Sequence, residues 1–179
     1  MALETVAQLI SRFKNLGAER IFCKHLSEND NSKQQIYLGG SFEVLSFFPH
    51  GEITAFSELR QPNFKASLDF YWIDVDTLEK AAGTQLILYP AYPEVRLSGF
   101  LSGCKEAPSK HLRQKPKEQR HGMDGRILVF ATTGDKRTFA YLAPENSPLA
   151  SELLHNFSKS PQKSLFFELT LPIGSQQNK

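Results

Sequence analysis

The stretch that decides the fold is FCKHLSENDNSKQQIYL, residues 22 to 38. A strand-like run that begins at Arg20 ends at Leu26, and a polar stretch follows from Glu28 to Gln35. Apolar residues resume at Ile36 and begin a new element. The pattern predicts a strand from Arg20 to Leu26 and then a polar arm, whose side chains can both donate and accept hydrogen bonds.

A second arm is predicted at YPEVRL, residues 92 to 97, which follows the strand-like run Gln85 to Tyr89. Glu94 and Arg96 are two residues apart, so on an extended segment both side chains lie on the same face. An arginine fork fits the two acceptors of guanine, and a carboxylate accepts from the cytosine amino group. The pair could therefore read a G·C-rich half-site. The alternative is an ordinary ion pair on a sheet surface.

These two motifs in this order resemble the N-terminal DNA-binding effector domain of EcoRII-like type II (type IIE) restriction endonucleases, a pseudobarrel related to the plant B-three domain. The first motif is KHLSEND, residues 24 to 30, and the second is Glu94-x-Arg96. A short helix predicted at Ser41 to Phe48, just before Pro49, is a third match. The resemblance runs from Arg20 to Val129. The first arm is shorter than in EcoRII and the second arm is less basic, which could shift specificity.

The resemblance implies a domain that binds double-stranded DNA at a CC(A/T)GG-like site through two major-groove arms, without cutting it. The bound domain would activate a C-terminal nuclease domain of the same chain, so the full-length protein would be a type II restriction endonuclease. The domain itself would be a non-catalytic monomer. It would need no cofactor, with Mg²⁺ expected for the attached nuclease domain. We expect the DNA-binding domain at residues 1–172 and a linker at 173–179, since the tail is small and polar.

The resemblance also suggests a role for individual side chains. The candidates for reading bases are Glu94, Arg96, Asn31, Gln34 and Gln35. The candidates for holding the DNA backbone or positioning an arm are Lys24, Ser27, Asn29, Asp30, Lys33, Tyr37, Lys105, Lys110 and Arg113. Asn29 and Asp30 suit a cap on the turn at the base of the arm, because both bond local backbone groups readily. Two alternatives stay open: Tyr37 as a strand residue packed on the barrel, and Lys24 as a solvated strand end.

A basic segment lies between residues 105 and 126. It has seven Lys or Arg residues against three acidic ones, although the net charge of the whole chain is only +2. Clustered positive charge of this kind is typical of a loop that contacts phosphates. A solvated charged loop without a ligand is an equal interpretation.

Length and composition fit one globular domain. A chain of 179 residues can bury a proper core, and its 14 phenylalanines suit a β-rich interior. Neither a membrane-length apolar run nor a secretory signal is present, so we expect a cytoplasmic protein of a prokaryote. The two cysteines are too few for a disulfide framework, and Cys23 is predicted to be a buried small hydrophobe.

The predicted fold class is mostly β (α+β), a seven-stranded pseudobarrel with two or three short helices. Hydrophobic periodicity predicts helices at residues 3–15, 41–48 and 147–157. Strands are predicted at residues 20–26, 65–74, 85–89, 95–99, 126–131, 137–142 and 165–171. A turn at Thr133-Gly134-Asp135 predicts a hairpin between two of these strands.

Two other functions are alternatives: a metal-dependent nuclease and a protein-interaction module. A metal-dependent nuclease would use acids such as Asp69, Asp74 and Asp76, but no acid-x-Lys motif follows them on a strand. A β-rich protein-interaction module would present Trp72 and the phenylalanines as an apolar patch, although such aromatics are more often core residues. The sequence leaves open the exact recognition site, which arm residue meets which base, and whether one domain covers the whole site.

Overall fold

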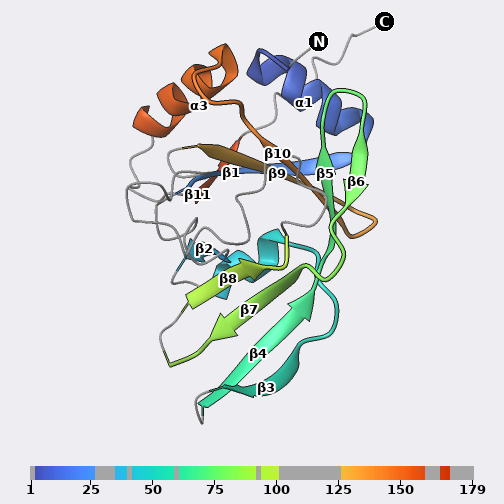
Figure 1. The fold of residues 1–179 in the computed structure, drawn as a ribbon, viewed down its shortest axis with the longest axis vertical. Helices are drawn as coiled ribbons and strands as arrows, with labels where there is room; N and C mark the ends of the chain where they lie inside the picture. Colours follow the sequence, from blue (N-terminus) through green and yellow to red (C-terminus); the bar gives the residue numbers. More distant parts are fainter. Residues whose placement is uncertain are drawn as a thin grey trace, which may run out of the picture.

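The computed structural model of the protein describes residues 3–26, 35–39, 42–58, 61–91, 94–100, 126–159 and 166–169. Strands in these residues form two sheets (Figure 1). The six-stranded sheet has the order β11-β1-β9-β10-β5-β6, with β1 Ala18–His25, β5 Asp69–Ile73, β6 Leu78–Lys80, β9 Ile127–Thr133, β10 Arg137–Leu142 and β11 Phe166–Leu169. The five-stranded sheet has the order β2-β8-β7-β4-β3, with β2 Gln35–Gly39, β3 Thr54–Glu58, β4 Gln61–Ser67, β7 Gln85–Tyr89 and β8 Glu94–Ser98.

The predicted mostly β class is confirmed, and the described residues form eleven strands rather than seven. Three helices accompany them: α1 (Val6–Asn15), a 3-10 helix (Phe42–Phe47) and α3 (Pro148–Lys159). Strands β2, β3 and β6 were not among the predicted strands. The sequence at β2 was predicted only as the start of a new element, and β3 and β6 lack alternation of apolar and polar residues. All three residues of β6 are exposed, for example, so its sequence shows no alternation of buried and exposed positions.

The main core lies between the two sheets. Phe22, Phe70 and Phe130 come from the six-stranded sheet and are fully buried there, and Leu86 and Leu97 of the five-stranded sheet pack in the same cluster. The rings of Phe70 and Phe130 meet edge to face, with centroids 6.3 Å apart. This packing sets the inner face of the five-stranded sheet, and therefore leaves its other face free to carry polar side chains.

A second core lies on the far side of the six-stranded sheet, where α1 and α3 cover it (Figure 1). Strand β9 separates the two cores, and all of its residues are buried. Helix α1 begins with a capping box between Thr5 and Gln8 and buries Leu9 and Phe13. The helix predicted at residues 3–15 is confirmed, and Gly17 follows it with φ +86°, which glycine adopts without strain.

The predicted strand at 65–74 is two strands that belong to different sheets. Strand β4 lies in the five-stranded sheet and β5 in the six-stranded one, and Leu68 between them bridges to His50. Ala66, Leu68 and Phe70 are all buried, so the alternation continues through the change of sheet. Alternation of buried and exposed side chains identifies a strand, but it does not indicate which sheet the strand joins.

Strand β10 pairs with two neighbours in the six-stranded sheet. Strands β9 and β10 form the predicted antiparallel hairpin around the turn at residues 134–136. Strand β10 also pairs in parallel with β5, from Arg137 opposite Asp69 to Ala140 opposite Trp72.

No helix among the described residues is both long and apolar enough to cross a membrane. The predicted linker at residues 173–179 lies outside the described residues.

Candidate nucleic-acid interface

Strand β8 places Glu94 and Arg96 on the outer face of the five-stranded sheet. Along this strand burial alternates, with Val95 and Leu97 fully buried and Glu94, Arg96 and Ser98 half-buried. The alternation follows from the strand period of two, since one set of side chains fills the core between the sheets. The predicted same-face placement of Glu94 and Arg96 is therefore confirmed.

The guanidinium of Arg96 makes three hydrogen bonds. Its Nε and Nη2 donate to Oε2 of Glu94 at 2.9 and 2.5 Å, and its Nη1 donates to Oε1 of Gln35 at 3.2 Å. The ion pair that was the alternative interpretation of this motif is thus present. The side chains of Arg96 and Glu94 are 24% and 29% exposed, so the pair is reachable from solvent.

Ion pairing leaves part of both side chains available. An arginine side chain carries five N–H donors, of which three serve these hydrogen bonds. Two donors of Arg96, and the second carboxylate oxygen of Glu94, make no hydrogen bond with the residues that the structure describes. The pair therefore presents two donors and one acceptor, which is the complement of what a G·C pair shows in the major groove.

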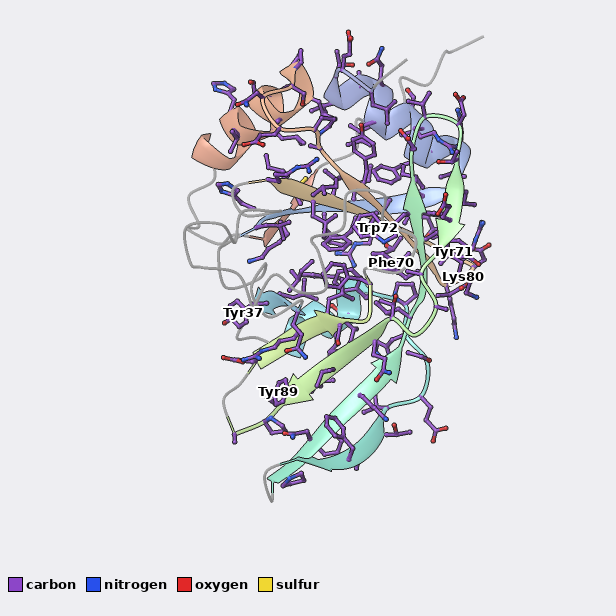
Figure 2. The ribbon with its side chains drawn as sticks, viewed as in Figure 1. Tyr37, Phe70, Tyr71, Trp72, Lys80 and Tyr89 are labelled. Carbon is purple, nitrogen blue, oxygen red and sulfur yellow. The ribbon has the colours of Figure 1, made fainter. Side chains whose placement is uncertain are left out.

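Two tyrosines flank this ion pair. The Arg96 guanidinium lies 5.0 Å from the ring centroid of Tyr89, which is within range of a cation–π contact. Tyr37 stands directly opposite Arg96 in the register of β2 and β8. We call Gln35, Tyr37, Tyr89, Glu94 and Arg96 the arginine cluster. Figure 2 shows its two tyrosines on the same side of the view, away from Tyr71 and Lys80.

The cluster includes the roots of both predicted arms. The first arm leads into β2 at Gln35, and the second leads into β8 at Glu94. These strands are antiparallel, with Gln35 opposite Ser98, so the two roots lie at opposite ends of β8. The four residue-to-residue steps from Glu94 to Ser98 separate those ends by roughly 14 Å. Arg96 is midway between them.

Tyr37 and Lys24 differ from the alternatives that the sequence left open. Tyr37 lies in a strand, yet it is 40% exposed rather than packed on the barrel. Lys24 is 2% exposed rather than a solvated strand end, and its Nζ lies 5.8 Å from the centroid of the Tyr37 ring. Its partner across β9 is the core residue Leu128, so Lys24 is on the core side of β1. Burial favours positioning over phosphate contact.

The other nine predicted site residues lie outside the described residues: Ser27, Asn29, Asp30, Asn31, Lys33, Gln34, Lys105, Lys110 and Arg113. Tyr89 is the member of the cluster to which no role was given from the sequence. Its parity could have indicated one, because Gln85, Ile87 and Tyr89 alternate with buried leucines and therefore share the outer face.

The residues that suggested a metal-dependent nuclease or a protein-interaction module do not come together in a site. Asp69 begins β5 and Asp74 directly follows its last residue, so the two are separated by roughly 17 Å of extended chain. Asp69 forms an ion pair with Lys80 at 2.9 Å. Among the described residues, no three potential metal ligands lie together. Trp72 is 6% exposed and belongs to the core, so it does not contribute to an apolar surface patch.

Comparisons with known proteins complete this description. No protein-family model matches the sequence, and no curated protein matches it. Among solved structures, the fold is similar to the UbaLAI restriction endonuclease B3 domain, whose crystal structure was determined with cognate DNA. The match has 21% sequence identity and a TM-score of 0.49, and covers 90% of this chain and 98% of that chain.

Proposed function

We propose that this chain is a sequence-specific double-stranded DNA-binding domain that uses the arginine cluster to read a G·C pair. The observation that carries the proposal is that Arg96 and Glu94 keep hydrogen-bonding groups available although they pair with each other. Two donors of Arg96 and one acceptor of Glu94 stay available on a half-buried pair that the sheet holds in place. Guanine offers two acceptors and cytosine one amino donor at the same edge of the base pair.

The two arms and the basic segment extend the interface in this proposal. Asn31 and Gln34 on the first arm would read neighbouring bases, and Lys33 would contact phosphates. Lys105, Lys110 and Arg113 would add phosphate contacts, which make binding sensitive to salt. Lys24 and Tyr37 would set the root of the first arm, because Nζ of Lys24 lies against the Tyr37 ring.

The target in this proposal is a CC(A/T)GG-like site, and the domain binds it without cleavage. It would act as a monomeric effector in the prokaryotic cytoplasm, regulating a C-terminal nuclease domain of the same chain. Mg²⁺ would belong to that nuclease domain, and this domain would need no cofactor. The target is supported by the order of the sequence motifs together with the placement of Arg96 between the two arm roots. The regulatory role rests on the resemblance of those motifs.

The test is a fluorescence anisotropy titration at fixed salt. Three duplexes are compared: one with CCAGG, one with a single base changed, and one unrelated. We expect tight binding to CCAGG alone. Equal binding to all three would contradict this target, and binding to none would remove the DNA-binding proposal. Plasmid incubated with Mg²⁺ and the chain should stay intact, and cleavage would contradict the non-catalytic role.

A further inference from the structure

The side-chain amide of Gln35 is the contact that joins the first arm root to Arg96. Gln35 is the first residue of β2, and its Oε1 accepts from Nη1 of Arg96 at 3.2 Å. Arginine has donors and no acceptor, so the amide must turn its oxygen towards Arg96 and its nitrogen away. The orientation of this glutamine is therefore fixed by chemistry.

We propose that Gln35 is a positioning residue, which holds the Arg96 guanidinium in the orientation that reads guanine and so couples the two arms. This inference rests on the proposed function. Glu94, at the root of the second arm, holds the Nε and Nη2 side of the guanidinium. Gln35, at the root of the first arm, holds the Nη1 side. Arg96 is thus fixed from both arm roots, while Tyr89 supports the guanidinium with its ring.

Direct base reading by Gln35 fits the geometry less well. A glutamine that reads adenine uses both halves of its amide, with the oxygen accepting from N6 and the nitrogen donating to N7. The oxygen of Gln35 is already occupied by Arg96. What the amide can do in place is restrict the motion of a long side chain before DNA arrives, which lowers the entropy lost on binding.

The chain offers a matched control for this glutamine. Gln85 in β7 also stands opposite Ser98, on the other side of β8 from Gln35. Both glutamines are half-buried. Gln35→Met removes the acceptor with little change of shape, and Gln85→Met makes the same change where no contact to Arg96 exists among the described residues. Gln35→Glu keeps an acceptor at the position.

The experiment measures the affinity of each variant for duplexes with every single base change in the recognised site. We expect Gln35→Met to reduce discrimination about tenfold, since a hydrogen bond to a charged group is lost. The loss should fall at the base position that Arg96→Ala also affects. In the Arg96→Ala background, Gln35→Met should have no further effect. Gln35→Glu should restore discrimination at lower overall affinity, and Gln85→Met should match the wild type.

Two results would overturn the inference while leaving the proposed function intact. One is an unchanged base profile in Gln35→Met. The other is a loss at a different base position that adds to that of Arg96→Ala, as direct base reading predicts. A measurement without DNA separates the two levels: rotation of the Arg96 guanidinium about its Nε–Cζ bond, followed by NMR of the Nη protons, should be faster in Gln35→Met than in wild type or Gln85→Met, because Gln35 bonds Nη1. Equal rotation rates in all three would refute the positioning role even if the chain bound no duplex.

Discussion

The indole Nε1–H of Trp72 donates a hydrogen bond to the main-chain carbonyl of Phe100 at a distance of 2.5 Å. Trp72 belongs to β5 in the six-stranded sheet, and Phe100 follows β8 of the five-stranded sheet. Both residues are buried, and their rings are in contact with centroids 6.3 Å apart. The bond therefore ties the two sheets together close to the strand that carries Arg96.

Replacing Trp72 should weaken the fold. Trp72→Phe keeps an aromatic ring and removes the donor for the buried Phe100 carbonyl. We expect the free energy of unfolding to fall by about 1–3 kcal/mol, which is the usual cost of leaving a buried polar group unpaired. Urea unfolding measures it. Tyr71→Phe, on the half-buried face of the same strand, is the control and should change stability less.

Arg96→Ala should cost about 1–3 kcal/mol of binding free energy on the cognate duplex and flatten the preference at one base pair. The reason is the loss of the donor fork that fits guanine. Lys80→Gln removes one positive charge on the other side of the molecule and serves as the control (Figure 2). Near-unchanged cognate binding by Arg96→Ala would show that guanine is read elsewhere.

Arg96→Lys distinguishes the fork from the charge. A lysine keeps the positive charge but has a single donor group in place of a planar fork. We expect affinity for unrelated DNA to stay close to wild type while discrimination at the guanine position falls. Anisotropy titrations with cognate and single-base variant duplexes measure both quantities. Full discrimination by Arg96→Lys would contradict bidentate reading.

The hairpin between β9 and β10 gives the stability a pH dependence. The hydrogen bond from Arg137 lowers the pKa of Asp135, and a hydrogen bond from the Thr133 hydroxyl lowers it further. A carboxyl whose pKa is lower in the folded state stabilises the fold above its unfolded pKa and loses this effect as pH falls through the folded value. Asp135→Asn should therefore be less stable than wild type at neutral pH, and the difference should vanish in acid.

Urea unfolding over a pH series measures this difference. Asp76→Asn, a change of another exposed carboxylate, controls for the general effect of removing a negative charge. A gap between wild type and Asp135→Asn that stayed constant from neutral pH into acid would rule out the ion pair with Arg137 as its cause.

The Cys23 thiol should be inert in the folded protein. Burial raises its pKa far above the usual range, so it stays protonated and unreactive. In a Cys104→Ser background, a thiol reagent should modify Cys23 only at the rate at which the protein unfolds, and mild denaturant should accelerate the reaction.

The unfolded Cys23 thiol ionises in alkali whereas the folded one does not, so stability should also fall as pH rises through the ordinary thiol range. Rapid modification under native conditions would contradict this burial.

Local pattern predicted several elements closely. The expected bounds of β7 and β10 agree with the structure, because in QLILY and RTFAYL the pattern of buried residues is set within the strand itself. The placement of Glu94 and Arg96 on one face followed from strand parity in the same way. Such predictions succeed because they depend on a single segment.

Features that depend on two segments were not predictable. The contact between Gln35 and Arg96 joins residues 61 positions apart, and it depends on the register of β2 against β8. The burial of Lys24 has the same origin, since its neighbour on β9 faces the core. The parallel pairing of β5 with β10 and the change of sheet at Leu68 also depend on tertiary contacts, which the sequence of one segment does not determine.

Strand β9, buried on both faces between the two cores, has a consequence for synthesis on the ribosome. Every strand of the five-stranded sheet, and β1 as well, is made before β9 emerges. Until then β1 lacks its neighbour, and the inner face that carries Leu86 and Leu97 has no completed sheet to cover it. Closure over such long separations is slow. The nascent chain therefore carries exposed apolar surface until β9 has emerged, and chaperones can bind that surface in this interval.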